Sequence, residues 1–489
     1  MTDSTRRLFL QGAAAGGALV GIGAFSAVSR WLAGEWDNAD DFSAFATPTS
    51  TEIDAISHML HRTSFGPRPG DYQRVQAMGV EAYLEEQLHP ERIDDSTAAR
   101  ITSRYEDLSV RPIGELLERA PADLLDQMTR DKIQRSLCSQ RQLLEVMVDF
   151  WSDHFNIDPS KGDARWLKVH DDREVIRPHA LGSFAALLRA SATSPAMLWY
   201  LDGRVNRRRN PEDQPNENYA RELLELHTMG VGGGYSQHDV MEVARCLTGW
   251  TVRERKRHGF AVGKVEFRRD LHDDEKKHVL GHDIPAGLGA GDLERVIDIL
   301  MHHPATARHL AKKLCQRFVS ESPTEAILTA VAQSFSRSGG QIRETLRTLF
   351  HHADFVSSRG TMIKRPYHFV LSALRATGAE TDAGPPLQNY LLRMGHAPFQ
   401  FPTPDGYPLE AQPWMGTLLW RWRFALDLVS GDIKGTSLSA DSLLRAAGEW
   451  PKLAAHLLGR QPTEEEKTAA AQVPLPLAFV LASPAFQFC

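Results

Sequence analysis

Three polar segments carry residue types that could do chemistry, and the first of them is centred on His154. This histidine continues an apolar stripe that recurs at three- and four-residue spacing over residues 143–151, so we expect it to point inward from a helix. An inward histidine beside Asp153 could be a metal ligand or a general base. The alternative is a core histidine that only makes hydrogen bonds.

The second segment, residues 168–179, crowds ionisable groups onto one predicted helix. Arg173 and Arg177 lie four residues apart and therefore share a helix face. Two guanidinium groups on one face could hold an anionic substrate by paired hydrogen bonds, so both are candidate catalytic residues together with His154. The alternative is a salt-bridge network with carboxylates of neighbouring helices.

The third segment, residues 216–230, is a predicted helix with apolar residues on nearly every side, which indicates burial. Buried carboxylates must be paired or must bind a cation. Glu222 and Glu225 are three apart and share a face, and with His227 they are the candidate ligands of a divalent metal ion. His227 lies well round the helix, so one helix cannot point all three at one ion, and an ordinary ion pair between Arg221 and Glu225 is the alternative. No other cofactor motif is present.

Helical periodicity dominates the elements that would position these residues. The first helix is predicted to begin at a capping box, Thr49-Ser50-Thr51-Glu52. Strand patterns occur only between Trp250 and Leu280, so the fold class is mainly α, a large multi-helix fold with a small β hairpin or sheet near 250–283. Residues 51–489 are expected to form one large helical domain, or two lobes, 51–248 and 290–489, around the β insertion.

The N-terminus reads as an export signal. Arg6-Arg7 is followed by Phe9-Leu10 and by an uncharged stretch from Gln11 to Ser29. This order is typical of a twin-arginine signal peptide over 1–29, with 30–50 as a linker. The expected partner is the twin-arginine translocation machinery, and the expected location is periplasmic or extracellular, with an uncleaved membrane anchor as the alternative. Because that route carries folded proteins, it also favours a bound metal or cofactor.

Composition fits an ordinary globular protein of 489 residues, 42% hydrophobic and 24% charged. The formal net charge of -6 is spread along the chain, which predicts no nucleic-acid partner. No second apolar run is long enough for a membrane span beyond the signal. The four cysteines include no CxxC pair and lie among apolar neighbours, so we expect buried free thiols rather than disulfides.

Several long motifs resemble a known bacterial family. They are His58–Pro67, Phe150–Asn156, Arg173–Phe184 and, longest, Asn216–Gly230. With the ending at Leu481–Phe488 they span about residues 52–488 and resemble the family called domain of unknown function 1800. The resemblance implies a large, mainly helical exported protein and carries no reaction with it.

Two functional hypotheses follow. The first is a metal- or cofactor-dependent enzyme that acts outside the cytoplasmic membrane, on cell-surface or extracellular carbohydrate. The second is a non-catalytic exported scaffold or assembly factor whose buried polar groups are structural.

Overall fold

The computed structural model describes residues 46–109, 112–210, 212–254 and 262–489. Arg6 and Arg7 lie outside these residues, as does most of the expected linker. Helices dominate the described chain and strands are few and short. The predicted fold class, mainly α with a small β insertion, is confirmed.

The helices before the β insertion run from the N-terminus of the described chain to Cys246. They are α3 (Ala55–Thr63), α4 (Asp71–Met78), α5 (Val80–Leu88), η1 (Pro90–Arg92), α6 (Ser96–Thr102), α7 (Glu106–Ser109), α8 (Ile113–Leu116), α9 (Pro121–Cys138), α10 (Gln142–His154), α11 (Ala164–His170), η2 (Asp171–Ile176), α12 (Arg177–His179), α13 (Phe184–Ala192), α14 (Pro195–Tyr200), η3 (Gly203–Val205), α15 (Asn218–Glu225) and α16 (Gln237–Cys246).

The helices after the insertion include several that begin at a proline, whose fixed φ suits the first turn of a helix. They are α18 (Gly291–His302), α19 (Pro304–Phe318), α20 (Glu325–Arg337), α21 (Ile342–Phe350), α22 (Ala353–Ser357), α23 (Pro366–Thr377), α24 (Pro385–Arg393), η6 (Gln412–Thr417), α25 (Leu418–Ser430), α26 (Ala440–Ala447), α27 (Trp450–Leu458), α28 (Glu464–Ala471), α29 (Pro476–Ala482) and α30 (Pro484–Gln487).

The β insertion consists of two antiparallel pairs. β1 (Trp250–Val252) pairs with β2 (Val265–Phe267), and β3 (Lys277–Val279) pairs with β4 (His282–Ile284), with η5 (Arg269–Leu271) between the pairs. A third pair, β5 (Glu380–Thr381) with β6 (Thr436–Ser437), lies outside the predicted insertion.

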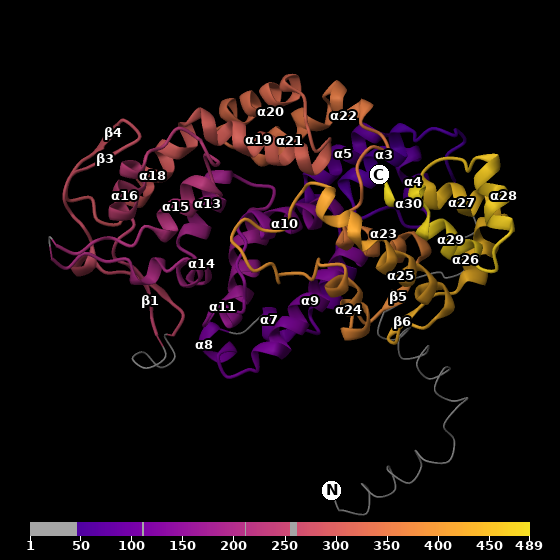
Figure 1. Ribbon diagram of the computed structural model, residues 1–489, viewed down its shortest axis with the longest axis horizontal. Helices are drawn as coiled ribbons and strands as arrows, with labels where there is room; N and C mark the ends of the chain where they lie inside the picture. Colours follow the sequence, from indigo (N-terminus) through magenta and orange to yellow (C-terminus); the bar gives the residue numbers. More distant parts are fainter. Residues whose placement is uncertain (1–45, 110–111, 211, 255–261) are drawn as a thin grey trace, which may run out of the picture.

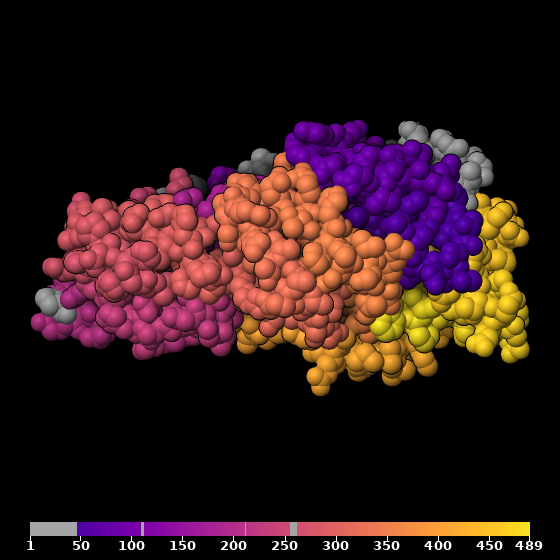
Figure 2. Space-filling view, turned by 90° about the horizontal axis from the view of Figure 1, so that it is seen from above, coloured from indigo at the N-terminus to yellow at the C-terminus, as the bar shows by residue number. Residues whose placement is uncertain are grey.

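The molecule is elongated, with the β insertion at one end and α26 to α28 at the other (Figure 1). The N-terminal helices lie against the C-terminal segment at that second end, as the indigo and yellow surfaces of Figure 2 show. In α3, the His58 ring contacts the Phe355 carbonyl at 2.8 Å, and Arg62 donates to the Ser358 carbonyl at 2.6 Å. These contacts join α3 to α22 (Ala353–Ser357) and to the residue that follows it.

Local signals set the helix boundaries. Ser236 and Asp239 form a capping box at the start of α16, and Thr463 and Glu466 form another at α28. The expected capping box at residues 49–52 is wrong. The first described helix begins later, where the Asp54 side chain accepts a hydrogen bond from the Ser57 amide.

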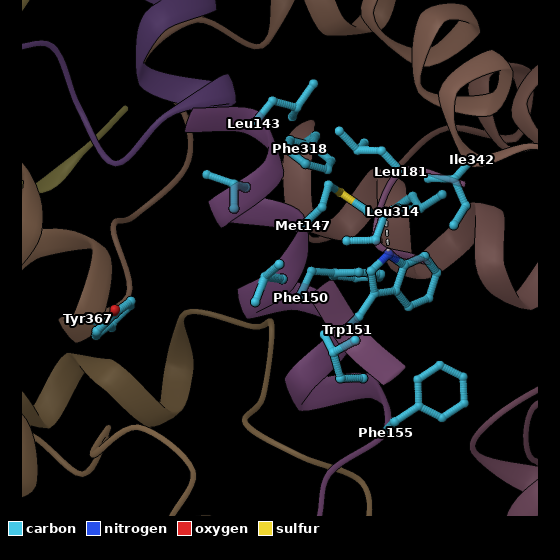
Figure 3. Close-up of a cluster of buried hydrophobic side chains, with 14 of the residues drawn as sticks. Leu143, Met147, Phe150, Trp151, Phe155, Leu181, Leu314, Phe318, Ile342 and Tyr367 are labelled. Atoms are coloured by element: carbon cyan, nitrogen blue, oxygen red, sulfur yellow. Dashed lines mark hydrogen bonds between the residues drawn. The ribbon is translucent and has the colours of Figure 1, made fainter. Parts of the chain in front are cut away.

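Helix α10 lies at the centre of the largest hydrophobic cluster. Figure 3 shows Met147 and Trp151 on the side of α10 that faces Leu314 and Phe318 of α19, with Tyr367 on its other side. The Trp151 indole donates to the Ala180 carbonyl at 2.9 Å, which satisfies its polar atom inside the core.

The four cysteines, Cys138, Cys246, Cys315 and Cys489, are buried free thiols, as expected. No helix in the described parts of the chain combines the length and the apolar character needed to cross a bilayer.

Candidate active site

One side of α10 is polar although it is buried. Glu145, Asp149 and Asp153 follow one another at four-residue spacing and therefore form a carboxylate stripe along the helix. A buried charge is tolerated when it is paired. Each of these carboxylates has a cationic partner from another part of the chain, so the stripe organises the charged interior of the protein.

The middle of the stripe carries the densest network. Asp149 contacts Lys132 of α9 at 2.7 Å and Arg365 at 3.1 Å, and Arg365 also reaches Asp153 at 3.0 Å. Although burial acts the other way, Lys132 and Arg365 hold the pKa of Asp149 well below its usual value. Burial, together with the neighbouring Asp149 charge, raises the pKa of Asp153 to about 6.

At the N-terminal end of the stripe, Glu145 binds Arg177. One Arg177 nitrogen lies 3.0 Å from both Glu145 oxygens, and the Arg177 Nε donates to Asp172 at 2.9 Å. Arg177 follows η2, a π-helical segment that continues α11. Pro178 cannot donate a backbone hydrogen bond and disfavours a regular helical turn, which favours the wider one. Such π segments occur frequently at functional sites.

A small charged cavity of about 190 Å³ lies between η2, α9 and the segment that contains Phe399. Its charged lining residues are Asp131, Arg135, Asp172, Arg173 and Arg177. The volume corresponds to about six water molecules, or to one small polar group of a substrate. We call this space the charged cavity.

Phe399 closes the cavity in a conformation that is uncommon for a residue with a side chain, with φ of 65°. Its ring lies 4.8 Å from the Lys132 ammonium group and 5.7 Å from that of Lys168. The chain after Phe399 is fastened by Asn156, which donates to the carbonyls of Phe401 and Thr403 at 2.9 and 2.7 Å. Strained backbone that neighbours hold in place is characteristic of functional sites.

The same segment approaches α10 closely at Gly406. A Cβ atom there would lie 2.1 Å from the Asp153 carbonyl oxygen, and φ is +73°. Only glycine fits this combination of contact and conformation. The position therefore holds the segment that carries Phe399 against the C-terminal end of α10.

Two carboxyl groups of the cavity have opposite electrostatic environments. Burial raises the pKa of Asp131, against the pull of Arg135 at 2.8 Å. Burial also acts on Asp172, but Arg177 and Lys168 lower its pKa below the usual value. In the part of the chain that the structure describes, each keeps one carboxyl oxygen without a hydrogen-bond partner. Pairs whose pKa values are pushed apart are suited to act as acid and base.

The predicted arginine pair is found at this cavity. Arg173 and Arg177 both line it, as their spacing indicated, but carboxylates already engage them. Arg177 is held by Glu145 and Asp172, while Arg173 contacts Glu174 at 2.7 Å and donates to the Leu108 carbonyl at 3.0 Å. The salt-bridge network is therefore present, and both arginines line the same cavity, while their binding role stays a prediction.

His154 and His227 lie in the core, away from the cavity lining. The His154 Nε2 lies 3.1 Å from the His227 carbonyl oxygen, and the two ring centroids are 6.2 Å apart. Burial lowers the pKa of His154 well below its usual value and that of His227 to about 3, so both rings are neutral at physiological pH. The surroundings of His154 are those of a core histidine.

Glu222 and Glu225 do share a face of α15, but His227 lies beyond the end of that helix and is fully buried. The sequence predicted a helix buried on nearly every side, but α15 is buried on one side only. Its charged residues Arg221, Glu222 and Glu225 are only half-buried. Burial and the nearby charge of Glu225 raise the pKa of Glu222. Within the described residues, no group of three or more His, Cys, Asp or Glu side chains is placed to hold a metal ion.

A wider cleft of about 890 Å³ lies on the other side of α9. Tyr105 lines both the cleft and the charged cavity. The neighbouring residues Arg130 and Asp131 point to different sides of α9, so Arg130 lines the cleft and Asp131 lines the charged cavity. The sequence offered no sign of Asp131 or Phe399, since neither lies in one of its polar motifs. An i,i+4 pair such as Asp131 and Arg135 is an ordinary feature of helices.

Fold and cavity together define the class of protein. It is a mainly helical protein whose buried charged network opens into a small cavity where carboxyl and guanidinium groups meet. Residues 58–488 match the family described as Protein of unknown function (DUF1800), and the chain belongs to that family. Comparison with curated proteins and with solved structures gives no match.

Proposed function

We propose that this protein is an exported enzyme that hydrolyses glycosidic bonds of cell-surface or extracellular carbohydrate at the charged cavity. The observation that carries the proposal is the pair Asp131 and Asp172, two cavity carboxyl groups in opposite electrostatic environments, each with one unpartnered oxygen among the described residues. Paired carboxyl groups of this kind are the usual machinery of glycoside hydrolysis.

In the proposed reaction, Asp131 in its protonated form donates a proton to the oxygen of the leaving sugar. Asp172 as a carboxylate takes a proton from the attacking water, and the glycosidic bond is replaced by two hydroxyl groups. Arg173 and Arg177 would orient sugar hydroxyl groups from the cavity wall. No step uses an ion at Glu222 and Glu225.

The lining favours an uncharged, hydroxyl-rich substrate. Asp131 is paired with Arg135 and Asp172 with Arg177, so a substrate with a full charge would have to break existing ion pairs. Hydroxyl groups can instead share these partners as hydrogen-bond donors and acceptors. The larger cleft, which Tyr105 also lines, is the space we assign to the remainder of a polymer.

The scaffold hypothesis has one observation in its favour. Both Arg177 and Asp149 are held by two partners of opposite charge, as residues of a purely structural network would be. Under this hypothesis the network only fixes the relative positions of α9, α10 and η2.

The test measures new reducing ends after the purified protein is incubated with isolated cell-envelope polysaccharide. We expect the parent to release them and the variants Asp131→Asn and Asp172→Asn to lose on the order of 10² or more of the rate. Asp283→Asn is the matched control, because this aspartate is exposed on β4. Thermal melts of each variant establish that the fold persists.

The pH profile adds a second criterion. The rate should rise as Asp172 ionises and fall as Asp131 loses its proton, because burial raises the pKa of Asp131 while Arg177 and Lys168 lower that of Asp172. A parent without activity on any polysaccharide, or an active Asp172→Asn variant, would overturn the proposal and move the scaffold hypothesis ahead.

A further inference from the structure

Helix α25 has apolar side chains on two opposite sides. Phe424, Ala425 and Leu428 are buried and pack into the core. On the opposite side, the preceding turn and the helix expose a second row of large apolar residues, Met415, Leu418, Leu419, Trp422 and Leu426. Apart from the adjacent pair Leu418 and Leu419, they follow one another at three- and four-residue spacing, which places them along one side of the helix. We call this row the apolar ridge.

The exposure of the ridge is high for residues of this type. Leu419 is 70% exposed and Trp422 is 55% exposed. Weighting the exposed fractions of the ridge residues by typical side-chain areas gives an apolar patch of roughly 600 Å². This is the upper end of the range for the largest apolar patch of a monomeric protein, and such patches are often functional. Figure 1 shows α24 and α25 together at the lower side of the molecule.

Guanidinium groups border the ridge. Arg393 lies 4.7 Å from the ring centroid of Trp420 and Arg423 lies 5.8 Å from it, so both cations are held over one indole. Arg423 is 65% exposed although it also contacts Asp427 at 3.5 Å. Exposed leucine and tryptophan with an arginine border are the residue set that enters the interface of a membrane with anionic lipids.

The described chain also begins near the helices that pack around α25. The Pro48 carbonyl accepts a hydrogen bond from the Gln461 side chain at 2.6 Å, just after α27. α27 packs on α29, which in turn packs on α25. The first described residues therefore contact the segment after α27, which belongs to the same group of packed helices as α25.

A second copy of the chain fits the ridge less well. Ridge-to-ridge pairing would bury about 1,200 Å² in total, which is at the lower limit for a specific interface. A two-fold axis through the ridge would also bring the same arginine border of both copies together. A lipid surface requires neither a matching shape nor a minimum area, and its phosphate groups complement the arginines.

We propose that the apolar ridge docks the folded protein on a membrane surface that contains anionic phospholipid. Leu419 and Trp422 enter the boundary between headgroups and acyl chains, and Arg393 and Arg423 contact lipid phosphates. The protein would thus lie on the membrane with the α24–α25 side facing the lipid. This inference is independent of the reaction at the charged cavity.

The test is flotation of the full-length protein with vesicles of phosphatidylglycerol and phosphatidylcholine, against vesicles of phosphatidylcholine alone. We expect the ridge variant, Leu419→Ser with Trp422→Ser, to bind at least five-fold more weakly than the parent. The matched control is Val231→Ser with Val356→Ser, which replaces valines that are 83% and 47% exposed elsewhere and should bind like the parent. All variants keep residues 1–45, so a difference reports on the ridge alone.

Two further measurements make the result decisive. Brominated lipid should quench tryptophan fluorescence more in the parent than in Trp422→Phe, and Arg393→Gln with Arg423→Gln should weaken binding only to the anionic vesicles. Light scattering gives the oligomeric state on the same samples. Equal vesicle binding by the parent and the ridge variant would overturn the proposal. The proposal would also be overturned if the parent is a dimer and the ridge variant, unlike the control variant, is a monomer. The ridge would then be assigned to a second copy of the chain.

Discussion

Buried neutral histidines should make this protein labile to acid. Burial lowers the pKa of His58 and of His227 to about 3 and that of His309 to about 4, against 6.5 for an exposed ring. Burial also lowers the pKa values of His61, His154, His368, His396 and His456. A ring whose pKa is lowered in the folded state favours folding above pH 6.5, and that contribution is lost as pH falls below 6.5 because only the unfolded chain takes up the proton.

The magnitude follows from these values. At pH 5, protonation stabilises each histidine of the unfolded chain by about 2 kcal/mol, and a buried neutral ring does not share this gain. His58, His227 and His309 together therefore lower the free energy of unfolding by about 6 kcal/mol at pH 5. Asp153 acts in the opposite direction. Burial raises its pKa to about 6, and its protonation between pH 7 and pH 5 returns about 1.4 kcal/mol to the folded state. A net loss of this size is a large share of the 5–15 kcal/mol typical of a folded protein.

His227→Phe isolates one contribution. Both ring nitrogens of His227 lack hydrogen-bond partners among the described residues, and the ring packs 4.9 Å from Phe155, so a phenyl ring should fit. Urea unfolding at pH 7 and pH 5, followed by circular dichroism, should show that the variant loses about 2 kcal/mol less than the parent. His302→Phe, at a site that is 81% exposed, should lose as much as the parent. Equal losses in the parent and in His227→Phe would refute the reasoning.

Three further predictions concern other parts of the chain. Arg6→Lys with Arg7→Lys should leave folded protein in the cytoplasm, as cell fractionation would show, whereas unchanged export would indicate a general secretory signal. Asp149→Asn removes the carboxylate that pairs with buried Lys132 and one of the two that pair with Arg365, so it should lower the free energy of unfolding by about 3–5 kcal/mol, measured by chemical denaturation; a loss under about 1 kcal/mol would argue against the network. Glu222→Gln removes a half-buried charge beside Glu225 and should change the free energy of unfolding by no more than about 0.5 kcal/mol at pH 7. A larger loss in a urea or thermal melt would contradict this prediction.

The helices were predictable where the hydrophobic periodicity is strong, and the residues at which they begin and end were less predictable. The stripe over residues 143–151 marked α10 correctly because one helix face contacts a single large core. The start of the first helix was misplaced because Thr49 to Glu52 and Asp54 both offer capping side chains, and only tertiary packing selects between them. α15 ends at Glu225 rather than near Gly230, and β5 and β6 are too short for strand periodicity to register.

The candidate site was predictable only in the part that one helix carries. Spacing alone places Arg173 and Arg177 on a shared face, because residues four apart on a helix are neighbours whatever surrounds them. Asp131 becomes a candidate only because α9 packs beside η2, which brings it to the same cavity as Asp172, 41 residues further along the chain. Its pKa is raised by burial, which no local motif indicates. The pKa of a buried carboxyl group depends on segments distant in the sequence, because these segments desolvate it and bring charges close to it. For His154 the sequence predicted only that the side chain points inward and left a functional and a core role open, whereas burial beside Lys313 and His227 keeps the ring neutral.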